Sequence, residues 1–495
     1  MTRRGLADDI WRACDVMRRD DNCSGVMEYL EHLSWILFLR FLDEQEEVFR
    51  QHARLANARY SPILRDEYRW SSWVPAALQE PSRDSVSLTG FVRNGLIPYL
   101  ASLDGSAERR LVSEIFGSGN LAICSSDDNL RDVLRVVDSI DFRNPDDIHT
   151  VSYIYEQLLH RLGRENRVAG EFYTPRPVIR FLVQLIDPRP DEEVYDPACG
   201  TCGFLVEAFE HMRRVPSADG HQVSRSVSLH GREKKRIPAL LGTMNLILHG
   251  VPTGKIYRGN TLEEDLDGRI DRHDVILTNP PFGGTENQLI QQNFPVRAAS
   301  TELLFLQHVM AKLKPSKSAR CGMVVPEGTL FRSGPFIAVK RRLLESCSLL
   351  MVASLPPGTF APYSDVRTAL LLFDQGGPTT EVLYYELPLP ANLKKFSLTH
   401  PIADEHFADA REVWAQWRAY RNGNGPRPNP TASSWIETAE ALADRNYDLA
   451  PRNPLVKSNG ASQSAVQLTA SLLTRNTELQ ERLARLHALT RNSEP

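Results

Sequence analysis

From about residue 165 onward, short apolar runs alternate with longer segments whose apolar residues recur at helical spacing. This alternation constrains the fold more than any other feature, because strands separated by helices pair in parallel and are covered on both faces. We therefore expect an α/β domain that binds its ligand at the carboxyl ends of the strands. The expected strands are Glu193–Asp196, Val227–His230, Lys255–Arg258, Asp274–Thr278, Gly322–Val325, Leu349–Ser354 and Ala369–Phe373. The expected helices are Pro177–Ile186, Phe204–Met212, Ile237–Leu248, Glu302–Leu313 and Phe336–Glu345.

The regions on either side have a different texture. Residues 1–160 are predicted to be mostly helical, with candidate helices around residues 29–41, 130–137 and 151–159. After about residue 400 the chain is polar and is expected to be rich in loops. The last 35 residues are predicted to return to helix, with three leucines spaced by seven, a pattern that favours packing on another helix of the same chain or of a partner. We expect three regions, 1–160, 161–400 and 401–495, and the heptad leucines are Leu472, Leu479 and Leu486.

Composition narrows the class of protein. The chain has 495 residues, too many for one ordinary domain. It has no apolar run near the ~20 residues that a membrane helix needs, and its first ten residues carry no apolar signal core, so a cytoplasmic location with no membrane contact is expected. Seven cysteines in this length do not make a disulfide scaffold. The net charge of -4 means that action on DNA would require a local basic groove or a partner that supplies one.

The most specific motif follows the strand predicted at 274–278. It reads Asn279-Pro280-Pro281-Phe282. Proline fixes the backbone and removes its own N–H, so this corner presents oxygen atoms: the side-chain oxygen of Asn279 and the backbone oxygen of Pro280. Two acceptors suit the two hydrogens of a planar NH₂ group, and Phe282 offers a face on which a planar ring can stack. The motif therefore predicts a site that holds an exocyclic amine and needs no strongly basic residue.

The stretch DPACGTCGFL, from Asp196 to Leu205, admits two interpretations. Its Cys199-x-x-Cys202 pair is compatible with a metal or redox motif, although a metal site needs further ligands and no second close pair follows. Alternatively, Gly200 and Gly203 allow a tight turn between a strand and a helix, which is typical of a loop beneath a cofactor. About thirty residues further on, Glu233 closes the next strand, where a carboxylate in dinucleotide-binding folds accepts hydrogen bonds from ribose hydroxyls.

These motifs together resemble a known family. Asn-Pro-Pro-Phe resembles the catalytic motif of amino-group methyltransferases that use S-adenosylmethionine, and DPACGT resembles their cofactor loop. The segment GEFYTPRP at 170–177 resembles one that precedes this loop in adenine DNA methyltransferases. More narrowly, the chain is similar to the methylation (modification) subunit of Type I restriction–modification systems. This resemblance implies a Rossmann-like S-adenosylmethionine-dependent methyltransferase domain, with a helical N-terminal domain and a helical C-terminal tail.

The resemblance also implies an activity and a site. The activity is methyl transfer from S-adenosylmethionine to N6 of adenine in double-stranded DNA, with the flipped base held by Asn279 to Phe282 and with no metal. The implied cofactor-binding residues are Glu171, Phe172, Tyr173, Thr174, Pro175 and Arg176 beside the methionine part, Asp196, Gly200, Thr201, Cys202 and Gly203 in the loop, Glu233 at the ribose and Asn260 at the adenine. The implied partners are a DNA-specificity subunit, a second methylation subunit and, as a further component, a restriction subunit.

Two residues depart from the family pattern. Cys202 stands where glycine is usual, and its side chain would crowd the cofactor if the position needs a positive φ. Asn260 stands where aspartate is common, which keeps an acceptor but loses a charge. Two alternatives therefore stay open: a methyltransferase acting on a protein glutamine, whose amide is also a planar NH₂, and a non-catalytic scaffold subunit whose altered loop binds no cofactor.

Overall fold

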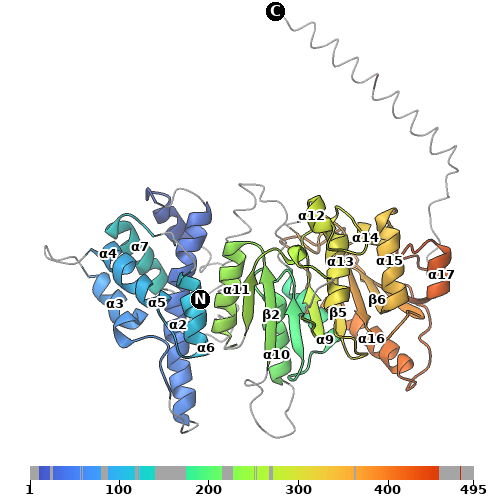
Figure 1. Cartoon of the computed structure of the whole chain (residues 1–495), viewed down its shortest axis with the longest axis horizontal. Helices are drawn as coiled ribbons and strands as arrows, with labels where there is room; N and C mark the ends of the chain where they lie inside the picture. The colour runs from blue at the N-terminus through green and yellow to red at the C-terminus, as the bar shows by residue number, and fades with distance from the viewer. Residues whose placement is uncertain are drawn as a thin grey trace, which may run out of the picture.

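The computed structural model describes residues 11–22, 26–55, 57, 60–79, 87–117, 121, 123–139, 174–214, 227–249, 251, 254–266, 271–361, 364–455 and 480. These residues form a helical N-terminal part and a larger part built on a single sheet (Figure 1). Helix α11 (Arg236–Leu248) lies between the two parts. Among the described residues, no helix combines the length and the apolar character needed to cross a membrane.

The N-terminal part packs around one long helix, α2. Its residues Tyr29, Leu33, Leu37 and Phe41 are buried, which confirms the helix face predicted from their spacing. The predicted helix around 130–137 is confirmed as well, whereas the candidate around 151–159 and the leucines of the C-terminal heptad lie outside the described residues. The helices of this part are α2 (Val26–Leu55), α3 (Trp70–Ala77), α4 (Leu88–Phe91), α5 (Ile97–Ala101), α6 (Ala107–Gly117) and α7 (Asp127–Asp138).

Helix α11 ties this part to the sheet. Its residues Ile237, Leu241 and Met244 belong to the core of the N-terminal part, although α11 itself follows a strand of the sheet. At its first turn, Arg236 donates through both terminal nitrogens to the two carboxylate oxygens of Glu31 in α2, at 2.6 and 2.5 Å. A shared core and a bidentate ion pair therefore fix the position of the helical part next to the sheet.

The sheet has nine strands in the order β3-β2-β1-β4-β5-β7-β6-β8-β9. The first five strands in this order are parallel, β7 runs antiparallel between β5 and β6, and β9 runs antiparallel beside β8. All seven predicted strands are confirmed. Their observed first residues lie within two positions of the predicted ones, and their last residues lie within three. The strands are β1 (Glu193–Asp196), β2 (Ser228–Glu233), β3 (Lys255–Arg258), β4 (Val275–Thr278), β5 (Arg320–Pro326), β6 (Ser348–Ser354), β7 (Thr368–Asp374), β8 (Glu381–Glu386) and β9 (Ser434–Thr438).

Helices cover both faces of the sheet, as the alternation of strands and helices predicted. Successive residues of β1 point to opposite faces, with Val194 in one core and Tyr195 in the other. One face carries α9, α10 and α16, and the opposite face carries α13 and α15. The helices of this part are α9 (Arg176–Ile186), α10 (Gly203–Arg214), α11, α12 (Gln288–Gln291), α13 (Thr301–Lys312), α14 (Gly328–Phe331), α15 (Pro335–Ser346), α16 (Ala408–Arg421) and α17 (Ala439–Asp444).

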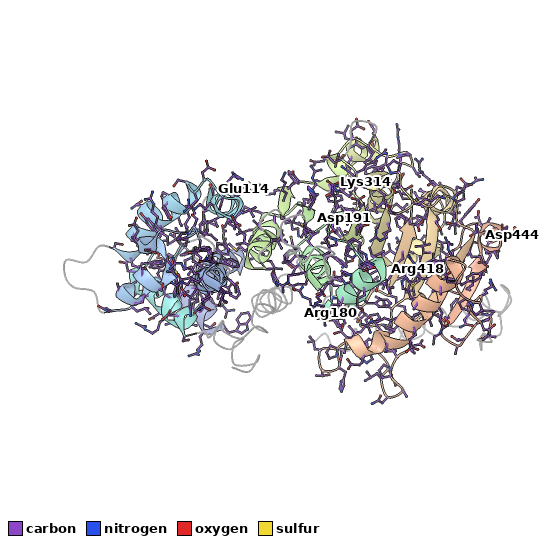
Figure 2. All side chains as sticks on the ribbon, turned by 90° about the horizontal axis from the view of Figure 1, so that it is seen from below. Glu114, Arg180, Asp191, Lys314, Arg418 and Asp444 are labelled. Atoms are coloured by element: carbon purple, nitrogen blue, oxygen red, sulfur yellow. The ribbon has the colours of Figure 1, made fainter. Side chains whose placement is uncertain are left out.

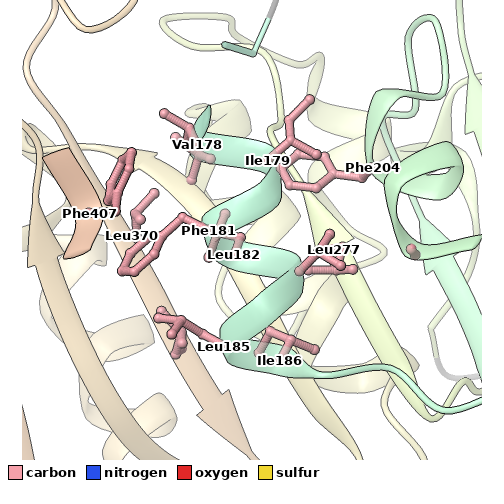
Figure 3. Close-up of a cluster of buried hydrophobic side chains, with 14 of the residues drawn as sticks. Val178, Ile179, Phe181, Leu182, Leu185, Ile186, Phe204, Leu277, Leu370 and Phe407 are labelled. Atoms are coloured by element: carbon pink, nitrogen blue, oxygen red, sulfur yellow. The ribbon is translucent and has the colours of Figure 1, made fainter. Parts of the chain in front are cut away.

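The expectation of a loop-rich chain after residue 400 is wrong for residues 404–421 and 434–444, whereas residues 422–433 between them form an exposed connection, as expected for the segment 421–434. Helix α16 packs Trp414 and Trp417 into the same core as α9, and β9 adds an edge strand to the sheet. Figure 3 shows Phe181 of α9 facing Phe407, and their rings stack with centroids 4.3 Å apart. On the solvent side of α9, Arg180, labelled in Figure 2, donates to both carboxylate oxygens of Asp404 at 2.9 and 2.6 Å. This segment therefore fixes α9, the helix that follows the first segment of the predicted site.

Candidate active site

The candidate site lies at the carboxyl ends of the parallel strands. Asp196 ends β1, Glu233 ends β2, and Asn260 follows β3 by two residues. Asn279 comes directly after β4. Because β3, β2, β1 and β4 are adjacent and parallel, these four side chains gather along one edge of the sheet, as the sequence predicted.

The loop after β1 is a tight turn held by other elements. Gly200 and Cys202 both have a positive φ, 51° and 64°, and the N–H of Cys202 donates to the carbonyl of Cys199 at 2.7 Å. From α11, Asn245 Nδ2 donates to the carbonyl of Thr201 at 2.9 Å. The turn leads directly into α10, which begins at Gly203. Its shape is therefore fixed by its own backbone and by a helix from a different βα unit.

Glu233 is joined to this turn through its carboxylate. Oε2 accepts the N–H of Gly200 at 3.0 Å and Oε1 accepts the N–H of Lys235 at 2.8 Å. Burial raises the pKa of Glu233, and the backbone N–H groups act in the opposite direction. A carboxylate has about four acceptor positions, so these two bonds leave capacity for the hydroxyl groups of a ligand.

Asp196 connects the cofactor loop to the Asn-Pro-Pro-Phe corner. Its Oδ1 accepts the N–H of Ala198 at 3.0 Å and the hydroxyl of Thr278 at 2.7 Å. Burial raises the pKa of Asp196 to about 7, and the hydrogen bond from Thr278 opposes this rise. Thr278 immediately precedes Asn279, so one buried carboxyl group sets the spacing between the two loops of the site.

The amide of Asn279 has one occupied and one available end. Its Nδ2 donates to the hydroxyl of Thr174 at 2.9 Å, whereas its Oδ1 is buried and has no hydrogen-bond partner among the described residues. A buried acceptor without a donor costs about 1–3 kcal/mol, so such a group generally marks a place where a ligand or water binds. The Oδ1 of Asn279 is therefore suited to accept a hydrogen bond from an amino group.

The rest of the corner is held by the start of α13. Thr301 Oγ1 donates to the carbonyl of Pro281 at 3.3 Å, and Glu302 Oε1 accepts the N–H of Gly283 at 2.6 Å. Phe282, half-buried, meets the edge of Phe360 with ring centroids 6.3 Å apart and planes inclined by 71°. Phe360 is itself buried and lies in the connection between β6 and β7.

The segment before the cofactor loop is described only from Thr174 onward; Glu171, Phe172 and Tyr173 lie outside the described residues. Pro175 is the N-cap of α9 and Arg176 is its first residue. An added Cβ at Gly203 would lie 2.9 Å from Ile179 and 3.9 Å from the Arg176 guanidinium. The start of α9 therefore lies directly against the start of α10, and a side chain at Gly203 would require the end of the Ile179 side chain to shift.

Cys202 adopts a left-handed backbone conformation, and its side chain points into the protein rather than out of the loop. Its side chain is fully buried, and a Cβ placed on Gly242 of α11 would lie only 2.6 Å from its sulfur. The thiol thus fills a place that the absent side chain of Gly242 provides. Cys199 is likewise buried, its pKa is raised by the neighbouring Cys202 thiol and by burial, and both thiols are free. Within the described chain, no group of three His, Cys, Asp or Glu residues is placed to hold a metal ion.

Asn260 has a local structural task. Its side-chain oxygen accepts the N–H of Leu262 at 3.2 Å and so caps the short 3₁₀ helix Thr261–Glu263. The next residue, Thr261, donates its hydroxyl to the carbonyl of Pro197 in the cofactor loop. Asparagine caps a helix as well as aspartate does. Asparagine in place of the family's usual aspartate at position 260 therefore preserves the cap of the 3₁₀ helix and, with it, the placement of Thr261 against the cofactor loop.

The strand order, the loop after β1 and the Asn-Pro-Pro-Phe corner together define a methyltransferase domain. Comparison with known proteins gives the family. A family model described as N-6 DNA methylase matches residues 146–462, and one described as the HsdM N-terminal domain matches residues 6–137. The chain therefore belongs to the N-6 DNA methylase family and, within it, to the methylase subunits of Type I restriction enzymes.

Individual relatives agree with this placement over nearly the whole chain. The EcoEI methylase subunit of a Type I restriction enzyme from Escherichia coli is 35% identical over 479 residues, 94% of each chain. A solved chain from a study of the assembly and conformational transition of the type I R-M system is 52% identical, covers 100% of both chains and has a TM-score of 0.73. A Vibrio vulnificus YJ016 chain, described provisionally as a modification subunit of a type I restriction enzyme, is 36% identical with a TM-score of 0.81, and the match covers 92% and 97% of the two chains.

Proposed function

We propose that this chain transfers the methyl group of S-adenosylmethionine to N6 of adenine in double-stranded DNA, as the methylation subunit of a Type I restriction–modification complex. The observation that carries this proposal is the buried, unpartnered Oδ1 of Asn279 beside Pro280 and Phe282, next to a loop suited to the cofactor. Family membership supports it as well and favours it over protein-glutamine methylation and over a scaffold role.

The residues present fit the cofactor. Glu233 keeps acceptor capacity for ribose hydroxyls, and Gly200, Thr201, Cys202 and Gly203 form the turn beneath it. We assign the adenine side to Asn260 and the methionine side to the segment from Glu171 to Arg176, with Asp196 between them. When bound, S-adenosylmethionine supplies a methyl group that its sulfonium already activates.

The protein then mainly supplies placement and polarisation. Asn279 Oδ1 and the Pro280 carbonyl accept the two hydrogens of the amino group, which directs the N6 lone pair toward the methyl carbon, while Phe282 stacks on the base. Held by these residues, S-adenosylmethionine would supply the methyl group, and the electron pair of the broken C–S bond would remain on its sulfur. The nitrogen afterwards releases one proton to solvent, so no strongly basic residue is required. The base must leave the duplex to reach the site.

The proposal includes partners. With a net charge of -4, the chain depends on another component for much of its affinity for DNA and for reading the sequence. We assign that role to a specificity subunit that binds two methylation subunits, with a restriction subunit as a further component. The segment that contains Leu472, Leu479 and Leu486 is our candidate for the contact. A cytoplasmic location, where chromosomal DNA is reached, belongs to the same proposal.

The test replaces Asn279 with alanine in the complex that co-purifies with its specificity subunit. Asn279→Ala should abolish methyl transfer to DNA, because the acceptor for the amino group is lost, while calorimetry should find S-adenosylmethionine bound as in the wild type. A matched control is Asn424→Ala, which alters an exposed asparagine beyond α16 and should leave activity unchanged. Methylation at the wild-type rate by Asn279→Ala would refute the assignment.

A further inference from the structure

Thr174 contacts the side chain of Asn279, whose orientation determines whether a donor or an acceptor faces the substrate. The Asn279 amide carries an acceptor, Oδ1, and a donor, Nδ2, at nearly equivalent positions. A half-turn of the amide exchanges the two. In the structure Nδ2 points at Thr174 Oγ1, 2.9 Å away, and Oδ1 is left buried without a partner. The hydroxyl of Thr174 thus marks the end of the amide that does not face the substrate.

The alternative orientation would oppose the reaction. With the amide turned, the Nδ2 hydrogens would face the hydrogens of the incoming amino group, and the donor would have no acceptor there. A hydroxyl can accept from Nδ2 or donate to Oδ1, so Thr174 anchors this end of the amide and limits its rotation, while an incoming amino group favours the orientation seen in the structure. The orientation in the structure, with Nδ2 at Thr174 and Oδ1 at the opposite end, is the one that presents an acceptor to an exocyclic amine.

Thr174 itself is placed by rigid neighbours. It is buried, with 8% of its surface exposed, and Pro175 follows it as the N-cap of α9. A residue before proline is confined to extended backbone, so the direction in which its hydroxyl points is restricted. Helix α9 is anchored by seven buried apolar side chains, among them Phe181 and Leu182. On the other side, Pro280 fixes the backbone after Asn279, and Thr278 is bonded to Asp196.

We propose that Thr174 is a positioning residue for methyl transfer: its hydroxyl holds the Asn279 amide with Oδ1 toward the target amino group. This inference rests on the proposed function, because it assigns a task within that reaction. Thr174 is already expected beside the methionine part of the cofactor. The inference gives it a second role, on the substrate side of the site. The segment before the cofactor loop then serves both reactants.

Two variants separate this task from cofactor binding. Thr174→Val keeps the shape of the side chain and removes the hydroxyl, whereas Thr174→Ser keeps the hydroxyl. Both are assayed in the complex with the specificity subunit, with DNA methylation measured at saturating S-adenosylmethionine and cofactor affinity measured by calorimetry. We expect Thr174→Val to lower kcat by about 10- to 100-fold with the cofactor Kd within about threefold of wild type. Thr174→Ser should restore kcat to within about threefold of wild type.

Several outcomes overturn the inference. Wild-type kcat in Thr174→Val would show that the hydroxyl does not position the amide. A weaker cofactor Kd with unchanged kcat at saturation would make Thr174 a cofactor contact alone. An equal loss in the serine variant would assign the effect to packing. If the valine variant does not fold, judged by its thermal transition, Thr174→Ala replaces it with the same expectations. Absence of adenine methylation by the wild-type complex itself would instead refute the proposed function.

Discussion

Replacing Gly242 of α11 by alanine should distort the cofactor loop from behind. An ideal Cβ at this position would lie 2.6 Å from the sulfur of Cys202 and 2.9 Å from the carbonyl oxygen of Gly200, where ordinary contact begins at 3.4 Å. Both neighbours are buried or half-buried parts of the turn, so the turn must move. Overpacking of this kind costs about 1–3 kcal/mol. Because Gly200 also donates to Glu233, we expect S-adenosylmethionine affinity to fall about tenfold, which equals about 1.4 kcal/mol.

The two clashes can be separated by a second substitution. Cys202→Gly removes the sulfur and relieves about 1–2 kcal/mol of left-handed backbone strain, which offsets the loss of a buried thiol. In this background Gly242→Ala meets only the Gly200 carbonyl, so its cost should shrink by about 1 kcal/mol or more as a coupling free energy. Urea unfolding and calorimetric titration with S-adenosylmethionine measure the four members of the cycle.

The control is Gly117→Ala, at the end of α6, where an added Cβ meets no described atom within 4 Å. It should leave cofactor affinity unchanged. Strictly additive effects of Gly242→Ala and Cys202→Gly, or a Gly242→Ala variant with wild-type stability and affinity, would contradict the packing described here.

Two further predictions concern the acidic residues of the site. Glu233→Gln should weaken S-adenosylmethionine binding about 10- to 100-fold by calorimetry, because the NH₂ end of the new amide must face the N–H of Gly200 or Lys235. Glu263→Gln, at an exposed position nearby, should leave the affinity unchanged. Equal affinities in the wild type and both variants would exclude this role of Glu233. For Asp196, whose folded pKa of about 7 exceeds its ordinary value of 3.8, the folded state holds the proton more tightly, so stability is greatest at low pH and falls as pH rises toward about 7. Urea unfolding between about pH 5 and pH 8 should show this loss in the wild type but not in Asp196→Asn. About two pKa units of the shift fall in this window, which at about 1.4 kcal/mol per unit gives a loss on the order of 3 kcal/mol; parallel pH profiles would contradict it.

The parallel part of the sheet could be predicted because most of its strands are short apolar runs that alternate with helices. That rule gave no cue for β8, since β7 leads to β8 with no helix between them. Strand β9 is a five-residue edge strand, SWIET, whose pairing with β8 is made by backbone groups that any sequence provides. Helix α16 carries only a narrow apolar stripe of Ala410, Val413, Trp414 and Trp417 among charged residues, so it was taken for part of a polar loop.

The motifs likewise predicted which residues lie at the carboxyl edge, but not what holds them there. Thr278 precedes the corner and was counted as strand, yet its hydroxyl joins the corner to Asp196. Asn245 and Gly242 lie in the helix predicted at 237–248, and their contacts depend on how α11 packs against the cofactor loop. A glycine inside an otherwise helical run was the one available signal, because it often marks close packing. Contacts of this kind join segments about forty residues or more apart, and periodicity carries no information about them.

The central claim is tested most directly by identifying the methylated product. The complex of this chain with its specificity subunit is incubated with double-stranded DNA and S-adenosylmethionine that carries an isotopically labelled methyl group. The DNA is then digested to nucleosides, and mass spectrometry is applied to both DNA and protein. The account predicts label in N6-methyladenine and its absence from the Asn279→Ala complex. Label in a polypeptide glutamine, or none in the DNA of a complex that binds both DNA and cofactor, would contradict it.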